Sequence, residues 1–447
     1  MSSLGHPTRV RPAQAHHLAG RTRRVIALLA IPLLALNLRS AITSIAPVLV
    51  QIQQQLHLSD TQASVLGALP PVIFGLAGIC TPFVIRRLGT DRSAVLAMLL
   101  ATCGLAVRAL SPDAYFFFVP QLVALVGMGM GNVLLPPLVK RHFPDRIGSL
   151  TVLYGIMLQL GTALPAFLAV PLDDAGGWRT SLGAWAGLSL IALWPWVMLS
   201  TGSTPTQPEP YAVAPATARR VPLSALLHNR VAWGATLLIG MTSLNTYPII
   251  TWLPQILTDA GVSRGVAGSL LGLYSLMSLP LALTIPWISV KLRNPLVVVL
   301  AGLACYLTGY AGLALAPSRA PLLWTVLTGL AATGFPLALA LANLRTLTHD
   351  GAVALSGFMQ GFGYLLASTG PLITGLLHSL TGGWQASFGF LALTLVPLTI
   401  GGVVFCRPVQ LENTLGPIAA DDRGTQMSAH NALARAVTHH DSPNATA

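Results

Sequence analysis

The residue of this chain best suited to bind a ligand through charge is Arg39, which lies deep within a long apolar stretch at residues 25–51. A charge near the centre of a bilayer costs roughly 2.5–3.5 kcal/mol on insertion scales, so such residues are usually kept for function. A guanidinium offers a planar fork of donors that fits anions and other electron-rich groups. We therefore predict that Arg39 is the central ligand-binding charge. The alternative is a structural arginine that donates to helix carbonyls and nearby amide side chains.

Acidic residues are missing from the apolar stretches of the chain. All thirteen Asp and Glu residues lie in connecting segments, at the ends of apolar stretches or in the tails. Arg39 is therefore expected to lack an internal counter-ion and to be the only formal charge in the apolar interior. Among the eleven histidines, only His378 approaches such a stretch, at its outer end.

Other polar residues of the apolar stretches are candidates for the same site. Thr43 lies one helical turn from Arg39 and shares its face. The remaining predicted site residues are Asn37, Asn132, Tyr154, Gln159, Asn245, Tyr247, Gln360 and Tyr364, with Thr246 and Tyr274 as further candidates. Polar side chains also join transmembrane helices to one another, typically by less than about 2 kcal/mol each. This structural role is the alternative for every one of them.

Twelve apolar stretches must position these residues. The chain is 53% hydrophobic and 9% charged, whereas a soluble globular protein usually has about 25% charged residues. A helix needs roughly twenty apolar residues to cross a bilayer. Such stretches lie near residues 25–51, 61–85, 92–110, 115–138, 149–171, 180–200, 231–257, 265–289, 295–316, 321–342, 353–377 and 384–405. The sequence therefore predicts an all-α membrane protein with twelve transmembrane helices.

The basic residues indicate the orientation of the chain. Twenty of the 25 Lys and Arg residues lie in the two tails and in every second connection, and four lie in the opposite connections. Because connections rich in Lys and Arg stay in the cytoplasm, both termini are predicted to be cytoplasmic in a multi-pass protein of the plasma (cell inner) membrane. The net charge of +12 is thereby explained without a nucleic-acid partner.

The two halves of the chain form a direct repeat. Three motifs recur at a nearly constant separation: Pro47 matches Pro254, Gly131 matches Gly334, and Trp178 matches Trp384. Parallel repeats of six spans are one of the known transporter architectures. We predict a cytoplasmic N-terminal tail (1–24), a six-helix bundle (25–200), a cytoplasmic linker (201–229), a second six-helix bundle (230–406) and a disordered cytoplasmic tail (407–447).

Three segments carry a family resemblance: LNLRSAIT at 36–43, GNVLLPPLVKR at 131–141 and MQGFGYLLA at 359–367. They resemble the cyanate permease and 2-nitroimidazole transporter (CynX/NimT) branch of the major facilitator superfamily, and together they extend across the membrane domain. The resemblance implies the MFS fold of two pseudo-symmetric six-helix bundles. It also implies a small organic or inorganic solute as the substrate.

The connection RRLGTDR at 86–92 resembles the superfamily's cytoplasmic basic loop, in which an acid and basic residues link neighbouring helix ends. This resemblance implies that Arg86, Arg87 and Asp91 form a cytoplasmic gate. The alternative is the ordinary excess of positive charge on the cytoplasmic side.

These features together favour a secondary active or facilitative transporter of a small, anionic or acceptor-rich solute, working by rocker-switch alternating access. The alternative is an exporter of neutral drugs or toxic compounds. An enzyme is not expected, because the apolar stretches hold no cluster of His, Asp, Glu or Cys for catalysis or metal binding. Neither a cofactor nor ATP is expected, since no GxxxxGK[ST] motif occurs. We expect a monomer whose partners are its small-molecule substrate and the lipid bilayer.

Overall fold

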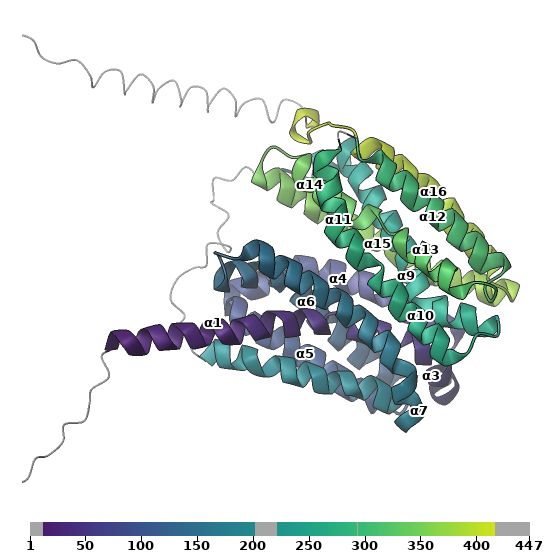
Figure 1. The fold of residues 1–447 in the computed structure, drawn as a ribbon, viewed down its shortest axis with the longest axis horizontal. Coiled ribbons are helices and arrows are strands. Elements are labelled where there is room, and N and C mark those ends of the chain that lie inside the picture. Colours follow the sequence, from purple (N-terminus) through teal and green to yellow (C-terminus); the bar gives the residue numbers. More distant parts are fainter. Residues whose placement is uncertain (1–11, 202–220, 293, 416–447) are drawn as a thin grey trace, which may run out of the picture.

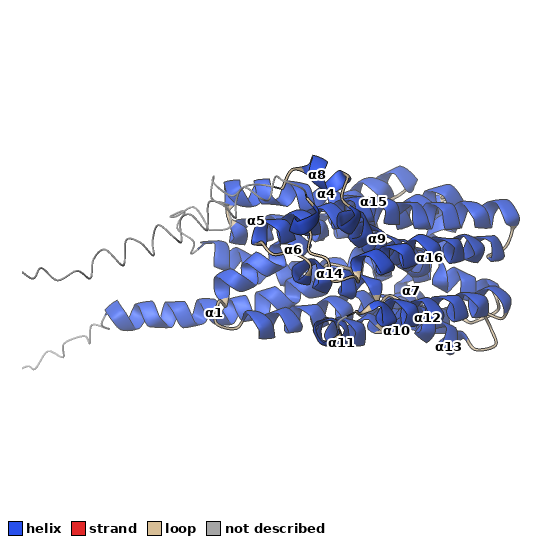
Figure 2. Ribbon diagram, turned by 90° about the horizontal axis from the view of Figure 1, so that it is seen from above, coloured by secondary structure: helices blue, strands red, loops and turns tan. Residues whose placement is uncertain are grey.

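The computed structural model describes residues 12–201, 221–292 and 294–415. Helices make up this part of the chain, and none of its residues forms a strand (Figure 2). The first half contains α1 (Pro12–Asn37), α2 (Ser40–Thr43), the 3₁₀ helix η1 (Ala46–Val48), α3 (Leu49–Leu56), α4 (Asp60–Leu88), α5 (Thr90–Ala109), α6 (Ala114–His142) and α7 (Ile147–Thr201). The short helix α8 (Leu223–Leu227) lies in the predicted linker.

The second half contains α9 (Arg230–Asp259), α10 (Arg264–Leu276), α11 (Ser278–Lys291), α12 (Leu296–Leu315), α13 (Pro321–Leu330), α14 (Gly334–Leu344), α15 (His349–Thr381), α16 (Gln385–Phe405) and the 3₁₀ helix η2 (Glu412–Thr414). Helices α10 and α11 follow each other directly and form one span, and so do α13 and α14. Residues 1–11 of the predicted N-terminal tail, 202–220 of the predicted linker and 416–447 of the predicted C-terminal tail lie outside the described residues.

The number of spans follows from helix length and from one bend. In the described ranges, nine segments are long and apolar enough to cross a membrane. One of them, α7, makes two passes, because Gly176 and Gly177 have non-helical backbone angles and Gly177 has a φ of 77°. Helices α9 and α15, of 30 and 33 residues, are also long enough to cross a membrane. Because they contain more polar residues, their mean hydropathy is lower than that of the nine segments. These helices together make twelve spans, which confirms the predicted fold class.

The two halves repeat each other in detail. The Trp178 indole donates to Gln55, at the end of span one, over 2.7 Å, and the Trp384 indole donates to Asp259, at the end of span seven, over 2.9 Å. Ser181 and Ser387 each donate to a backbone carbonyl of the preceding span in their own half. Equivalent residues therefore make equivalent contacts, as the direct repeat predicts.

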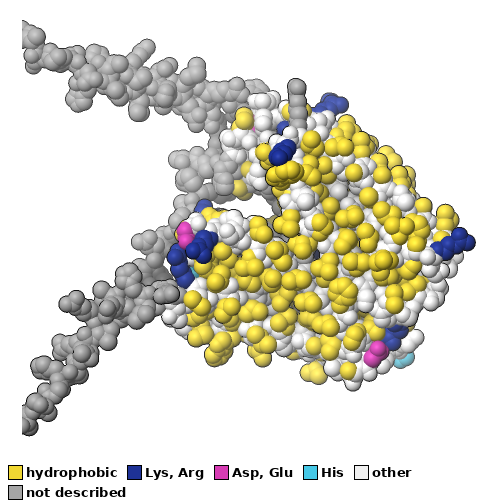
Figure 3. Space-filling model, in the orientation of Figure 1, with side chains coloured by type: hydrophobic (Ala, Val, Ile, Leu, Met, Phe, Trp, Pro, Cys, Tyr) yellow, Lys and Arg dark blue, Asp and Glu magenta, His cyan; other side chains and the backbone are white. Residues whose placement is uncertain are grey.

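The halves separate toward one end of the molecule. We call this end the tail face; it carries the connections around residues 89, 145, 229, 292 and 347 and the segment 407–415. The opposite end, with the connections around residues 58, 112, 176, 261, 318 and 383, is the far face. Figure 1 shows the two halves diverging toward the tail face, and Figure 3 shows the surface hollowed between them there. The face of the molecule seen in Figure 3 is largely covered by apolar residues.

Close packing joins the halves on the far-face side. Gly67 of α4 lies against Thr251 of α9 and Pro371 of α15, and Gly272 of α10 lies against the ring of Phe167 of α7. A side chain at either glycine would overlap these neighbours. The two bundles therefore approach each other most closely between the centre and the far face.

Span one is broken beside Arg39, although the sequence predicted a single stretch at 25–51. Helix α1 ends at Asn37 and α2 starts at Ser40, and Arg39 has φ −125° and ψ −8° between them. The Ser40 and Ser44 hydroxyls donate to the Asn37 and Ser40 carbonyls. Serines that bond to backbone carbonyls bend helices, and Pro47 has no N–H with which to continue an α-helix.

Candidate functional site

A cavity of about 280 Å³ lies between the two halves at the level of the break in span one. Its walls come from Arg39, α2 and α7 of the first half and from α9, α10, α11, α13, α14 and α15 of the second. Arg39 is the one charged residue among the lining residues, and none of them is a carboxylate. The cavity is therefore a shared site of both bundles with a single positive charge.

Five of the predicted site residues line this cavity together. They are Arg39, Thr43, Gln159, Tyr247 and Tyr364. The Thr43 hydroxyl donates to the Arg39 carbonyl over 3.3 Å, so the two residues are also tied locally. Thr246 and Tyr274 line the cavity as well. The structure thus brings a cation, an amide and several hydroxyl groups to one space.

The guanidinium of Arg39 has no acidic partner in the described part of the chain. Its Cζ lies 5.1 Å from the centre of the Phe74 ring, which is a cation–π distance. No hydrogen bond or ion pair of this side chain is found among the described residues. The donors of Arg39 are therefore available to a molecule in the cavity.

The other predicted site residues lie outside the cavity. Asn37, Asn132 and Gln360 each donate to the carbonyl four residues earlier, those of Leu33, Met128 and Ser356. Tyr154 is half-buried and is not a lining residue. In each case the side chain bonds within its own helix or packs beside the site.

Asn245 also lies outside the cavity, because it joins three helices. It is fully buried, donates to the Met241 carbonyl and to the Thr394 hydroxyl, and accepts from the Tyr310 hydroxyl over 2.9 Å. These partners lie on α9, α16 and α12. All of the carboxamide's main donors and acceptors are used in packing the second half.

Four hydroxyl-bearing residues of the cavity were missed by the sequence analysis: Thr162, Ser243, Ser275 and Ser278. Three of them donate to carbonyls of their own or the preceding turn, as Thr162 does to Leu158 over 2.8 Å. Since any buried Ser or Thr of a transmembrane helix can do this, their sequence pattern carries no signal for a site. Only the packing of the halves identifies them.

The predicted cytoplasmic gate residues do not come together in the structure. Asp91 is 2% exposed and pairs with Arg23 at 3.1 Å, Arg141 at 3.6 Å and His142 at 2.9 Å. Arg86 and Arg87 are exposed, and Arg86 lies over the Phe83 ring. The buried acid therefore fastens the ends of spans one, three and four within the first half.

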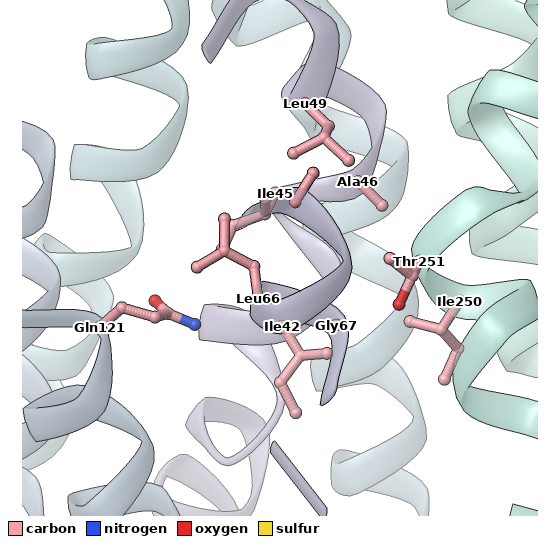
Figure 4. A pocket seen from close by; sticks show the side chains of 10 residues that line it. Ile42, Ile45, Ala46, Leu49, Leu66, Gly67, Gln121, Ile250 and Thr251 are labelled. Atoms are coloured by element: carbon pink, nitrogen blue, oxygen red, sulfur yellow. The ribbon is translucent and has the colours of Figure 1, made fainter. Parts of the chain in front are cut away.

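Two isoleucines separate the cavity from the far face. Ile42 and Ile250 line both the large cavity and a pocket of about 20 Å³ beyond it. Figure 4 shows these residues on opposite walls, from α2 and α9. The small pocket has room for about one water molecule. The route to the far face is therefore closed, whereas the halves diverge toward the tail face.

The prediction of a single interior charge does not hold. Arg108 is one of the four basic residues that the sequence analysis places in the opposite connections, but it is a residue of α5 with 0% exposure. Its guanidinium binds groups of span one and α6 rather than solvent. Among the described residues, no three His, Cys, Asp or Glu side chains are grouped to hold a metal.

Comparisons with known proteins agree with this architecture. The sequence model of the Major Facilitator Superfamily matches residues 33–352. The chain is 33% identical over 397 residues to the 2-nitroimidazole transporter of Escherichia coli (strain K12), covering 88% of this chain and 98% of that protein. It is 29% identical over 381 residues to the cyanate transport protein CynX of the same strain, with coverages of 83% and 95%. It is also 33% identical over 374 residues to the uncharacterized transporter YycB of Bacillus subtilis (strain 168), with coverages of 83% and 90%.

Solved structures share the fold at low sequence identity. A bacterial homologue of the human lysosomal transporter Spinster, in an inward-facing and unoccupied conformation, matches with a TM-score of 0.67 at 16% identity, covering 86% of this chain and 96% of that one. The D-xylose–proton symporter matches with a TM-score of 0.66 at 15% identity, with coverages of 87% and 99%.

Proposed function

The chain belongs to the major facilitator superfamily, and we propose that it moves a small, anionic or acceptor-rich solute across the plasma (cell inner) membrane by rocker-switch alternating access. It is a membrane transporter and not an enzyme. In our proposal the tail face and both termini are cytoplasmic, in agreement with the distribution of basic residues. The conformation described above is then inward-facing.

One observation carries this proposal: Arg39 lines a cavity between the halves without a carboxylate beside it. A cation in such a place is costly unless something compensates it. A substrate with negative charge, or with strong acceptor atoms, supplies the compensation when it binds. A cationic substrate would meet repulsion from Arg39 and find no acid in the lining.

The cavity is chemically asymmetric, and this asymmetry supports coupling between binding and movement. The first half provides the guanidinium of Arg39, while the second half provides the phenol groups of Tyr247, Tyr274 and Tyr364. A ligand held by both sides favours conformations in which the halves are close to it. Its differential affinity for the open and closed states is what shifts the equilibrium between them.

The named relatives support the same size and class of substrate. Cyanate is a small anion. The 2-nitroimidazole molecule is a small ring whose nitro oxygens and unprotonated ring nitrogen can accept hydrogen bonds. The relatives named for these solutes are 29% and 33% identical to this chain over most of its length. The cavity of about 280 Å³ is suited to molecules of this order.

Proton coupling through a carboxylate or histidine of the cavity is not part of the proposal, because neither residue type lines it. Uniport, exchange and symport driven by the substrate's own charge are compatible with the lining. An exporter of neutral drugs is the second candidate. The apolar part of the wall, with Ile42, Leu281 and Phe335, favours it.

A thermal-shift screen of the purified protein tests the proposal. The ligands are cyanate, nitrate, small carboxylates and 2-nitroimidazole, each compared with a neutral or cationic molecule of similar size. A ligand at about 100 times its Kd stabilises the folded protein by about 2.7 kcal/mol. Stabilisation by anions or acceptor-rich solutes supports the proposal. Stabilisation by neutral apolar or cationic molecules alone would favour the exporter.

A further inference from the structure

Arg108 is buried next to the break in span one without an acidic partner in the described residues. Its Nη1 donates to the Ala41 carbonyl over 3.0 Å and to Gln121 Oε1 over 2.6 Å, and its Nη2 donates to the Ser44 hydroxyl over 3.4 Å. Gln121 lies on α6 and is fully buried as well. Two polar side chains from two other spans thus converge on residues 41–44.

The carbonyl of Ala41 needs these donors because span one is broken. In a continuous α-helix it would accept from the N–H of Ile45. Here that N–H bonds to the Ile42 carbonyl instead, over 3.4 Å. Gln121 Nε2 also donates to the Ala41 carbonyl, over 3.1 Å. Figure 4 shows the Gln121 amide pointing at the short helix that bears Ile42.

The position of this carbonyl affects the cavity directly. Ala41 lies midway between Arg39 and Thr43, which both line the cavity. The backbone here is held by few regular helix bonds, since α2 has only four residues. Arg108 and Gln121 bind Ala41 and Ser44 on the side of the segment that faces away from the cavity. Arg39 and Thr43 then lie on the side that faces the cavity.

Stability alone does not account for a buried arginine at this place. Apolar side chains of similar volume often stabilise a protein as well as a buried charge does or better. An arginine with two outer nitrogens in a fixed plane, however, can bind the Ala41 carbonyl, Gln121 and Ser44 at defined angles. Hydrogen bonds at defined angles can hold residues 41–44 in one orientation.

We propose that Arg108 and Gln121 are positioning residues, whose hydrogen bonds hold the broken segment of span one in the register that turns Arg39 and Thr43 into the cavity. The expected effect on substrate rests on the function proposed above. The effect on the segment itself does not, because it is a property of the backbone around Ala41.

The accessibility of residue 43 tests the position of the segment without substrate. Thr43→Cys is introduced into a protein whose four cysteines are replaced by alanine, and its reaction with a charged, water-soluble thiol reagent is timed. In Arg108→Met the rate should change by about tenfold, in the range expected when a hydrogen bond from a charged donor is lost. Arg108→Lys, which keeps the charge and one donor nitrogen, should restore much of the original rate.

Ser181→Ala is the matched control, because it removes a buried hydrogen bond of the same half, over 2.8 Å to Ala169, in which residues 41–44 take no part. It should lower the melting temperature and leave the labelling rate unchanged. If Arg108→Met lowers the melting temperature but leaves labelling within twofold of the parent, the residue is merely structural and the inference is overturned. Should Arg108→Met not fold, Gln121→Leu takes its place with the same expected outcome.

Substrate affinity separates this inference from the proposed function. With a ligand found in the thermal-shift screen, Arg108→Met should raise the Kd by about tenfold, and Arg108→Lys should recover part of the loss. If Arg39→Ala binds that ligand normally, the proposed function fails, while the labelling of residue 43 still decides the role of Arg108. If Arg39→Ala loses binding but the labelling is unaffected by Arg108→Met, only the positioning role fails.

Discussion

Asp173 of α7 and Arg264 of α10 form an ion pair across the two halves at the far face. The carboxylate is 8% exposed and the guanidinium 40%, so solvent screens the pair on one side only. It lies on the same side as the close packing of Gly67 and Gly272 with the opposite half. The pair is present in a conformation whose route to the far face is closed.

We predict that Asp173→Asn weakens this closure. A half-exposed pair contributes up to about 1 kcal/mol, so the population of the open far face should rise by roughly fivefold. The measurement is labelling of a cysteine placed at Ile250, using a reagent that reaches only the far face. The exchanged pair Asp173→Arg with Arg264→Asp should return the labelling rate toward that of the parent. Equal labelling in Asp173→Asn and the parent would show that the pair is not part of the closure.

Arg39→Ala should strongly weaken binding of the substrate while the protein still inserts and folds. A hydrogen bond to a charged group contributes about 1.5–3 kcal/mol, so the Kd should rise by about tenfold to a hundredfold or more. Arg39→Lys should lose less, since it keeps the charge but not the planar fork. Isothermal calorimetry checks both. Arg319→Ala, an exposed arginine of the far face, is the control, and wild-type affinity in Arg39→Ala would remove the basis of the anion site.

Gly272→Val should disfavour the conformation described here. A Cβ at this position would overlap the ring of Phe167 in the opposite half, and overpacking of this kind costs about 1–3 kcal/mol. The halves should therefore open on the far-face side, which distance measurements between spin labels on α7 and α10 would detect. Gly265→Val is the matched control on the same helix, because its Cβ would meet no atom within 4 Å. A similar shift in both variants would point to the helix itself instead of the contact.

Asp91→Asn should destabilise the first half. The carboxylate is 2% exposed and has Arg23, Arg141 and His142 as partners, and removing one member of a buried charge network costs about 3–5 kcal/mol. Its melting temperature should fall clearly below that of the parent. Asp145→Asn provides the comparison, because Asp145 pairs with Arg24 while both are at least half exposed, and its loss should cost less than about 1 kcal/mol. Equal effects of the two changes would contradict this reading of Asp91.

The architecture was predictable from the sequence because it depends on long-range patterns. Three such patterns are the apolar stretches of span length, the alternation of basic connections and the repeat of Trp178 as Trp384. Each can be recognised in the sequence even where a helix is bent or broken. The bend at Gly177 and the polar helices α9 and α15 conceal spans from a simple hydropathy criterion. The alternation of basic connections nonetheless predicts these spans, because without them basic connections would fall on both sides of the membrane.

The site was predictable only in part, because a polar residue in a span looks the same whether it faces a cavity or a neighbouring helix. Arg39 stood out because its charge is rare at that depth. Asn245 looked equally suitable as a cavity residue. Its side chain is instead hydrogen-bonded to Tyr310 and Thr394, which are distant in the sequence. Arg108 lies near the end of its apolar stretch, so it resembled a loop charge until its contacts with Ala41 and Gln121 were known.

In the alternating-access cycle proposed above, the uncompensated charge of Arg39 makes the empty carrier sensitive to voltage. When the cavity opens to the cytoplasm, Arg39 lies at the cytoplasmic potential, and when it opens outward, at the external one. The change of state then moves up to one positive charge across the field, which is worth about 2.3 kcal/mol per 100 mV. A membrane that is negative inside therefore favours the inward-facing empty carrier. A bound monoanion cancels the charge, so the loaded carrier reorients without electrical work, and the membrane potential opposes uptake of such a substrate and promotes its release from the cell.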